Sequence, residues 1–263
     1  MTIHQLSTEF DTLLNSYSGI PSQDIRLDEY EKSVFLTQAQ EETVLSFYTG
    51  RNTTGKGFEE TEEVRRYLSN LIADVVLTPI TNTSGYPIGM DSKSYFFTLP
   101  NGITEEEHSS TGYGYEPIGD WDLPAVWFIT YESVKVHYSE KRCGQDYGYM
   151  AVIPARQDEY HKLKHNPFRG LNDRRALRFD LSDGVVEIVC NYAVTNYYVR
   201  YLRKPKPIIL VDLEDEGLNI EGYTAKTEEL EVNEALHRQI LENAVILALR
   251  SRGYSTNNKN ENK

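Results

Sequence analysis

Cysteine is scarce in this sequence: 263 residues contain only Cys143 and Cys190. Two cysteines do not make a disulfide framework, so we expect a reducing compartment. Long apolar runs are absent too, and no stretch reaches the roughly 20 residues that a membrane-spanning helix requires. The first residues, MTIHQLSTEF, lack the apolar centre of a signal peptide. We therefore expect no role for a membrane.

Positive charge is also in short supply. Lys and Arg number 27 against 40 Asp and Glu, which gives a formal net charge of −13. A broad nucleic-acid-binding face needs clustered Lys and Arg, so the balance argues against one. It suits a surface that DNA slides past, and solubility explains it equally well. Hydrophobic content of 39% and charged content of 25% are those of an ordinary globular protein.

Tyrosine, by contrast, is abundant, with 19 copies. Its ring and hydroxyl serve together at protein interfaces, where it is enriched. The composition therefore favours a protein that assembles with others.

Apolar residues at helical spacing predict helices in the first part of the chain. One covers residues 5–16, a second begins at Thr37 with Gln40 as its capping-box partner and closes at Gly50, and a third covers residues 59–75.

From about residue 80 the hydrophobic period changes to two, which predicts strands. They cover residues 94–99, 125–138, 147–153, 176–181, 185–190 and 195–202. A short helix over residues 158–165 interrupts them, and a last helix runs from the N-cap Asn233 to about Arg252. The fold class is therefore α+β, with N-terminal helices, a central, mostly antiparallel β-rich region and a C-terminal helix.

Four regions follow from this pattern, and we expect them to form one integrated domain. They are an N-terminal helical region (1–79), a β-rich region (80–231), a C-terminal helix (232–253) and a flexible tail (254–263). The β-rich region contains a long polar loop, 101–122, and loops of that length are usually functional or mobile. It carries Tyr113, Tyr115 and Trp121, large aromatics that we expect to contact a neighbouring subunit.

The stretch 195–213 begins as a strand and then meets Pro205 and Pro207, which remove two backbone donors. Four cations crowd this turn in an otherwise acidic chain: Arg200, Arg203, Lys204 and Lys206. One interpretation is an edge strand that charge protects against aggregation. The other is a docking surface for another chain, and we take these four cations as candidate contacts between subunits.

Two motifs approach catalytic patterns and fall short of them. Residues 50–57, GRNTTGKG, have the spacing of a phosphate-binding P-loop, but Gly57 replaces the Ser or Thr that binds magnesium and a helix precedes the motif. His161 and His165 are spaced as metal ligands on a helix, yet two lysines and no general-base Glu lie between them.

The remaining candidates lack partners. Cys143 and His137 could form a thiol nucleophile and its base, but they flank a turn and no residue is seen to orient them. Cys190 ends an apolar strand and is expected to be a small core residue. Residues 105–107 are a run of glutamates without a base that converges on them. The basic turn with Arg174, Arg175 and Arg178 could hold a nucleic-acid strand, although salt bridges to acidic groups suit the acidic chain better. We expect no enzyme activity, no catalytic residue, no metal and no cofactor.

Four stretches together resemble a family of virion proteins, the neck or ring proteins that connect portal to tail in crAss-like tailed bacteriophages. They are residues 30–40 (YEKSVFLTQAQ), 166–169 (NPFR), 201–208 (YLRKPKPI) and 233–241 (NEALHRQIL). The resemblance implies a structural protein of the virion, assembled in the host cytoplasm. It implies a homo-oligomeric ring, a dodecamer, that binds the portal and other neck or tail proteins and passes genomic DNA through its lumen. The alternatives are a capsid decoration protein and an enzyme packaged in the virion.

Overall fold

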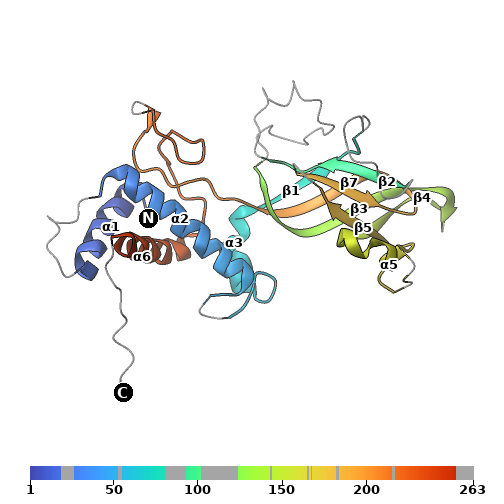
Figure 1. Ribbon diagram of the computed structural model, residues 1–263, viewed down its shortest axis with the longest axis horizontal. Coiled ribbons are helices and arrows are strands. Elements are labelled where there is room, and N and C mark those ends of the chain that lie inside the picture. Colours follow the sequence, from blue (N-terminus) through green and yellow to red (C-terminus); the bar gives the residue numbers. More distant parts are fainter. Residues whose placement is uncertain are drawn as a thin grey trace, which may run out of the picture. The chain divides into compact units, whose positions relative to one another are not determined.

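The computed structural model describes residues 1–18, 27–52, 55–80, 93–101, 124–142, 144–164, 166, 168–181, 184–214 and 217–252. The chain divides into two compact units (Figure 1). The helical unit comprises Met1–Leu71 and Pro205–Lys263, and the sheet unit comprises Ile72–Lys204. The sheet unit is thus an insertion in the sequence of the helical unit.

The helical unit is built on α1 (Ile3–Ser18), α2 (Glu29–Thr49) and α6 (Glu234–Ser251), with the short α3 (Glu62–Leu68) and a 3₁₀ turn (Ser69–Leu71) after α2. Although α1 and α6 lie at opposite ends of the chain, they pack side by side (Figure 1). The helices bury apolar side chains at helical spacing. These include Leu6, Phe10 and Leu14 of α1, Leu36, Val44 and Phe47 of α2, and Leu236, Ile240 and Ala244 of α6.

The start of α2 differs from the prediction. The helix begins one residue after Asp28, whose carboxylate accepts a hydrogen bond from Glu31 N (2.6 Å), while the Glu31 carboxylate accepts one from Asp28 N (3.3 Å). This earlier capping box leaves Thr37 and Gln40 in the middle of the helix, so the prediction of a start at Thr37 was wrong. The predicted end is confirmed, because Gly50 closes the helix at φ 76°.

The predicted helix over residues 59–75 was wrong at its C-terminal end. The helix stops at Leu68, and Ile72–Leu77 form strand β1. Each residue of β1 pairs with β7 (Ala193–Arg203), from Ile72 opposite Leu202 to Leu77 opposite Tyr197. Pairing with β7 along the whole strand overrides the local helical spacing, because the neighbouring strand supplies hydrogen-bond partners for the backbone of β1.

The described strands form one sheet of seven in the order β1-β7-β3-β4-β5-β6-β2. The remaining bounds are β2 (Ser94–Thr98), β3 (Val126–Arg142), β4 (Gln145–Pro154), β5 (Arg175–Asp180) and β6 (Val185–Val189). Neighbouring strands are antiparallel except for β4 and β5, which are parallel. The α+β class with a mostly antiparallel centre is therefore confirmed.

Strand β7 lies inside the sheet, between β1 and β3. The interpretation of this stretch as an edge strand was therefore wrong. The two prolines that suggested an edge lie beyond Arg203, the last paired residue of the strand, so they interrupt no ladder.

The sheet curls until the two ends of the strand order lie next to each other. Ile80, just after β1, donates its backbone N–H to Phe96 O of β2 (2.9 Å). The rings of Phe97 in β2 and Tyr197 in β7 lie 5.2 Å apart between centroids. The enclosed core contains side chains from every strand of the sheet. Outside it, α5 (Tyr160–Lys164) packs through Tyr160 against Phe179 of β5.

A buried ion pair lies on the core side of this sheet. Glu132 of β3 accepts hydrogen bonds from Arg178 (2.8 Å) and from the Tyr197 hydroxyl (2.6 Å). Burial is the largest single effect and opposes the charge of Arg178, but Glu132, Tyr197 and Asp180 together outweigh it and raise the pKa of the guanidinium. Burial and then Glu132 raise the pKa of Tyr197, which keeps its hydroxyl neutral as a donor.

The helical unit also contains an extended segment, residues 205–213, that we call the strap. The strap runs along α2, and its backbone is hydrogen-bonded by α2 side chains at every second residue. The pairs are Leu210 N with Ser33 Oγ (3.0 Å), Ile208 N with Thr37 Oγ1 (3.0 Å) and Lys206 O with Gln40 Nε2 (2.8 Å). The lengths of the two bonded segments are similar. Seven residues of helix span about 10 Å, and four extended residues span about 13 Å.

We predict that Glu132→Ala destabilises the sheet unit by about 2–3 kcal/mol, because Arg178 and Tyr197 both lose their acceptor and Arg178 keeps only the exposed Asp180 as an ion-pair partner. Tyr197→Phe removes one neutral donor and should cost only about 1 kcal/mol. Urea unfolding followed by tryptophan fluorescence measures both, since both tryptophans of the chain lie in the sheet unit. Equal losses for the two variants would contradict a structural role for the charge pair.

A second prediction concerns the strap. Thr37→Val keeps the side-chain volume but leaves the buried N–H of Ile208 without an acceptor, which should lower the free energy of unfolding by about 1–3 kcal/mol. Thr37→Ser keeps the hydroxyl and should lose less. Thr12→Val is the control, because its hydroxyl is exposed on α1. Denaturation followed by far-UV circular dichroism compares them, and a Thr37→Val curve equal to that of Thr12→Val would reject the proposed contact.

Candidate assembly interfaces

The four cations predicted to contact a neighbouring subunit do not all belong to one unit. Arg200, Arg203 and Lys204 belong to the sheet unit, whereas Lys206 belongs to the helical unit. Arg200 makes an ion pair inside the chain, its Nε lying 2.7 Å from Asp74 Oδ1 on the neighbouring strand β1. Both side chains are more than half exposed, so this pair adds little to stability.

The other three cations lie where the chain passes out of the sheet. Arg203 is opposite Val126 at the end of the β3–β7 ladder, and Lys204 follows it; both are partly exposed. Lys206 has an exposed side chain, but its backbone is held on both sides, by Gln40 and by Glu231. These cations stay predicted contacts. The predicted aromatic contacts Tyr113, Tyr115 and Trp121, with the loop that carries them, lie outside the described residues.

A group of tyrosines that the sequence analysis missed lies on the outer face of the sheet. Tyr131 of β3, Tyr147 and Tyr149 of β4 and Tyr198 of β7 form what we call the tyrosine face. Tyr149 is 66% exposed and its ring lies 5.8 Å from that of Tyr198. The sequence signal was Tyr147 and Tyr149, which are two residues apart in β4, because residues two apart share one face of a strand.

Lysine and histidine accompany the tyrosines on this face. Lys135 lies over the ring of Tyr147, 5.0 Å from its centroid, and His137 packs edge-on against the same ring at 5.1 Å. Exposed aromatic groups of this extent mark sites of interaction in soluble proteins. The tyrosine face is therefore a candidate interface beside the predicted one.

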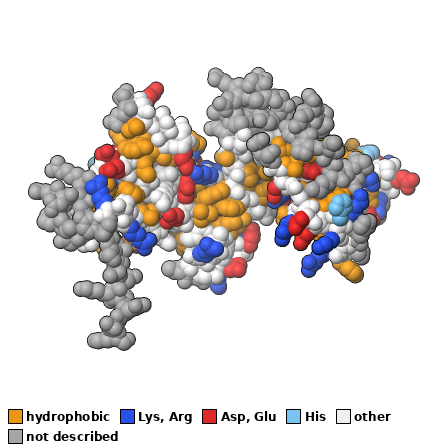
Figure 2. Space-filling view, viewed as in Figure 1, with side chains coloured by type: hydrophobic (Ala, Val, Ile, Leu, Met, Phe, Trp, Pro, Cys, Tyr) orange, Lys and Arg blue, Asp and Glu red, His pale blue; other side chains and the backbone are white. Residues whose placement is uncertain are grey.

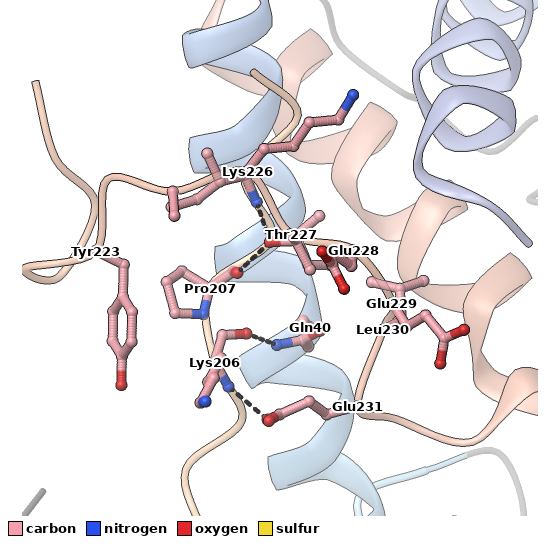
Figure 3. A pocket seen from close by; sticks show the side chains of 13 residues that line it. Gln40, Lys206, Pro207, Tyr223, Lys226, Thr227, Glu228, Glu229, Leu230 and Glu231 are labelled. Carbon is pink, nitrogen blue, oxygen red and sulfur yellow. Dashed lines mark hydrogen bonds between the residues drawn. The ribbon is translucent and has the colours of Figure 1, made fainter. Parts of the chain in front are cut away.

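A groove lies beside the strap in the helical unit (Figure 3). The strap forms one wall and residues 223–231 form the other, with a cavity of about 420 Å³ between them. Thr227 joins the walls: its hydroxyl accepts from Ile209 N (2.8 Å) and donates to Pro207 O (3.0 Å). The accessible apolar lining consists of Tyr223, Ala225 and Leu230, and the lining carries carboxylates at Glu228, Glu229 and Glu231.

The motifs that approach catalytic patterns have structural roles where the structure describes them. Gly50 is the C-cap of α2, and Gly57 N donates to Glu60 in the connection to α3, so no strand precedes the P-loop-like residues. Cys190 is fully buried with its Sγ 3.6 Å from Met150 Sδ, and burial raises the pKa of its thiol. Such a thiol is a poor nucleophile.

Of the two histidines spaced as metal ligands, His161 is exposed on α5, and His165 lies outside the described residues, as does Cys143. Within the described ranges, no group of three or more His, Cys, Asp or Glu side chains is placed to hold a metal ion. The same part of the chain contains no helix long and apolar enough to cross a membrane.

The basic turn of residues 174–178 does not present its cations together. Arg178 is buried against Glu132, and Arg175 donates to the carbonyl of Phe168 (2.6 Å), which leaves Arg174 with an exposed side chain. Arg178, the most buried of the three arginines, therefore forms an ion pair within the chain and is not available to bind a nucleic-acid strand.

Comparison with known proteins relates this chain to ring proteins of phages. The sequence matches the family described as "Phage tail ring protein 3/4" over residues 1–109 and 121–260. It is 41% identical over 260 residues to "Ring protein 3" of Bacteroides phage crAss001, covering 98% of this chain and 100% of that protein. It is also 29% identical over 257 residues to "Ring protein 4/5" of the same phage, covering 94% and 92%. The chain belongs to the phage tail ring protein 3/4 family.

Proposed function

We propose that this chain forms a homo-oligomeric ring of twelve copies in the neck between portal and tail of a crAss-like phage, and that the genome passes through the ring. The observation that carries the proposal is the match to a ring protein family over nearly the whole chain. A structural ring protein needs no active site. Its partners in this proposal are further copies of itself, the portal and the other neck or tail proteins, and its place is the virion.

The distribution of charge supports contact between copies and passage of DNA. The helical unit has 13 Lys and Arg against 23 Asp and Glu, a formal charge of −10, and the sheet unit has 14 against 17, a charge of −3. The helical unit thus carries most of the negative charge. It is repelled less by the nearly neutral sheet unit of another copy than by another helical unit, and an acidic lumen lets DNA slide without binding.

Phage crAss001 has proteins named for more than one ring, and this chain is similar to two of them. That similarity supports a neck built of successive rings of related subunits. The loop aromatics Tyr113, Tyr115 and Trp121 are proposed contacts of this chain with a neighbouring subunit.

Electron microscopy of the purified chain, combined with native mass spectrometry, tests the proposal. We expect closed rings of twelve copies with an open centre, and a tagged chain should be located between portal and tail in the assembled particle. Tagged copies spread over the shell would support a capsid decoration protein in its place, and particles with the tag elsewhere in the tail would contradict the neck position.

The proposed contact at Arg203 and Lys204 leads to a further prediction. Reversing both to Glu should change the melting temperature of the monomer little, because surface charge pairs are each worth under about 1 kcal/mol, yet impair assembly, because one contact recurs around the ring. The matched control is Lys141→Glu with Arg156→Glu, two exposed cations of the same unit. Size-exclusion chromatography at physiological salt compares them, and equal assembly of both double variants would contradict the contact.

A further inference from the structure

One side chain stands out on the surface of the sheet unit. Phe168 is 84% exposed, more than any other large hydrophobic side chain in the part of the chain that the structure describes. A solvent-exposed phenyl ring of this extent loses the free energy that its burial would supply, about 2 kcal/mol. We therefore take Phe168 as a candidate anchor for a partner protein.

The backbone around Phe168 is tightly held. Asn166 Oδ1 accepts hydrogen bonds from Phe168 N (2.9 Å) and Arg169 N (3.0 Å), and the Asn166 carbonyl accepts one from Gly170 N (2.8 Å). A side chain at Gly170 would collide with the carbonyl oxygen of Leu163, so only glycine fits there. The turn therefore fixes the backbone that carries Phe168, which reduces the entropy lost when the segment docks.

Cations flank Phe168 in the sequence. Lys162 and Lys164 lie on α5, and Arg169 and Arg174 lie on either side of the turn; all four are exposed. Figure 2 shows Lys and Arg side chains over the part of the sheet unit that carries α5, with Asp and Glu side chains among them. We call Phe168 with these four cations the basic knob. The partner that fits it has an apolar hollow with an acidic rim.

The groove beside the strap has this chemistry. Pro207 and Ile209 are buried, so the accessible apolar wall of the groove consists of Tyr223, Ala225 and Leu230. Its edge carries three carboxylates, Glu228, Glu229 and Glu231, against two cations, Lys206 and Lys226 (Figure 3). Its cavity of about 420 Å³ is large enough for a phenyl side chain. The groove belongs to the acidic helical unit and the knob to the sheet unit.

We propose that the basic knob of one copy docks in the acidic groove of the next copy around the ring, with Phe168 against the apolar wall and Arg169 beside Glu229. A knob and a groove on different surfaces of the same chain make a head-to-tail contact, the type that closes rings. The inference rests on the proposed ring, and it adds which surfaces meet.

Cross-linking tests the contact without removing the phenyl ring. In a Cys143→Ser background, full-length Arg169→Cys chains are mixed with full-length Glu229→Cys chains and oxidised. A disulfide forms only where Cα atoms come within about 7 Å, so we expect covalent dimers in the mixture and in neither variant alone. Arg156→Cys mixed with Glu229→Cys is the control for random collision and should stay monomeric. Equal yields in the two mixtures would overturn the inference.

Truncation of the anchor gives a second measure. Phe168→Ala should raise the protein concentration for half-assembly by about tenfold, because interface anchors contribute more than about 1 kcal/mol. The melting temperature of the monomer should not change, since the ring is exposed. Rings that assemble as readily as the parent would contradict the docking of Phe168.

Exchange of charges distinguishes this contact from the ring itself. Arg169→Glu with Arg174→Glu, and separately Glu228→Lys with Glu229→Lys, should each weaken assembly, and a chain with all four changes should regain it. If the parent forms rings but the combined chain assembles no better than either double variant, knob and groove do not meet and the ring proposal stands. A parent chain that stays monomeric contradicts both.

Discussion

The helical unit depends on hydrogen bonds between side chains of α2 and the backbone of the strap. Among the described residues no strand pairs with the strap, although Thr224 and Thr227 each share one backbone hydrogen bond with it, and its apolar side chains Ile208, Ile209 and Leu210 are buried. A buried backbone N–H without an acceptor costs as much as a lost hydrogen bond, so each donor of the strap needs a partner. Ser33 and Thr37 supply acceptors from one side and Thr227 from the other.

This arrangement gives the prolines and small polar residues a common explanation. Pro205 and Pro207 have no N–H to satisfy and favour extended backbone, so they suit alternate positions in a segment held by side chains. Ser33, Thr37 and Gln40 are polar residues on a buried face of α2, where a leucine would be expected for packing alone. They are buried because they take the place of a neighbouring strand.

The sequence predicted the fold class and most strands, because alternation in β2 to β7 is local and strong. It misplaced the start of α2 and missed β1, since the polar residues of the strap contact look like a helix cap and the pairing of Ile72–Leu77 with β7 depends on residues far along the chain. The ion pair between Glu132 and Arg178 could not be predicted for the same reason, because the two residues are far apart in the sequence. For the interfaces, charge and tyrosine content indicated assembly, but Phe168 emerged only from its exposure in the folded turn.

The insertion of the sheet unit begins and ends on paired strands. Ile72 is the first residue of the sheet unit and pairs with Leu202, which lies two residues before the last residue of the unit, Lys204. The two ends of the inserted segment are therefore adjacent. Segments with adjacent ends can be exchanged between related proteins with little loss of loop entropy. The length and sequence of the inserted sheet unit can therefore change while α1, α2 and α6 keep their packing.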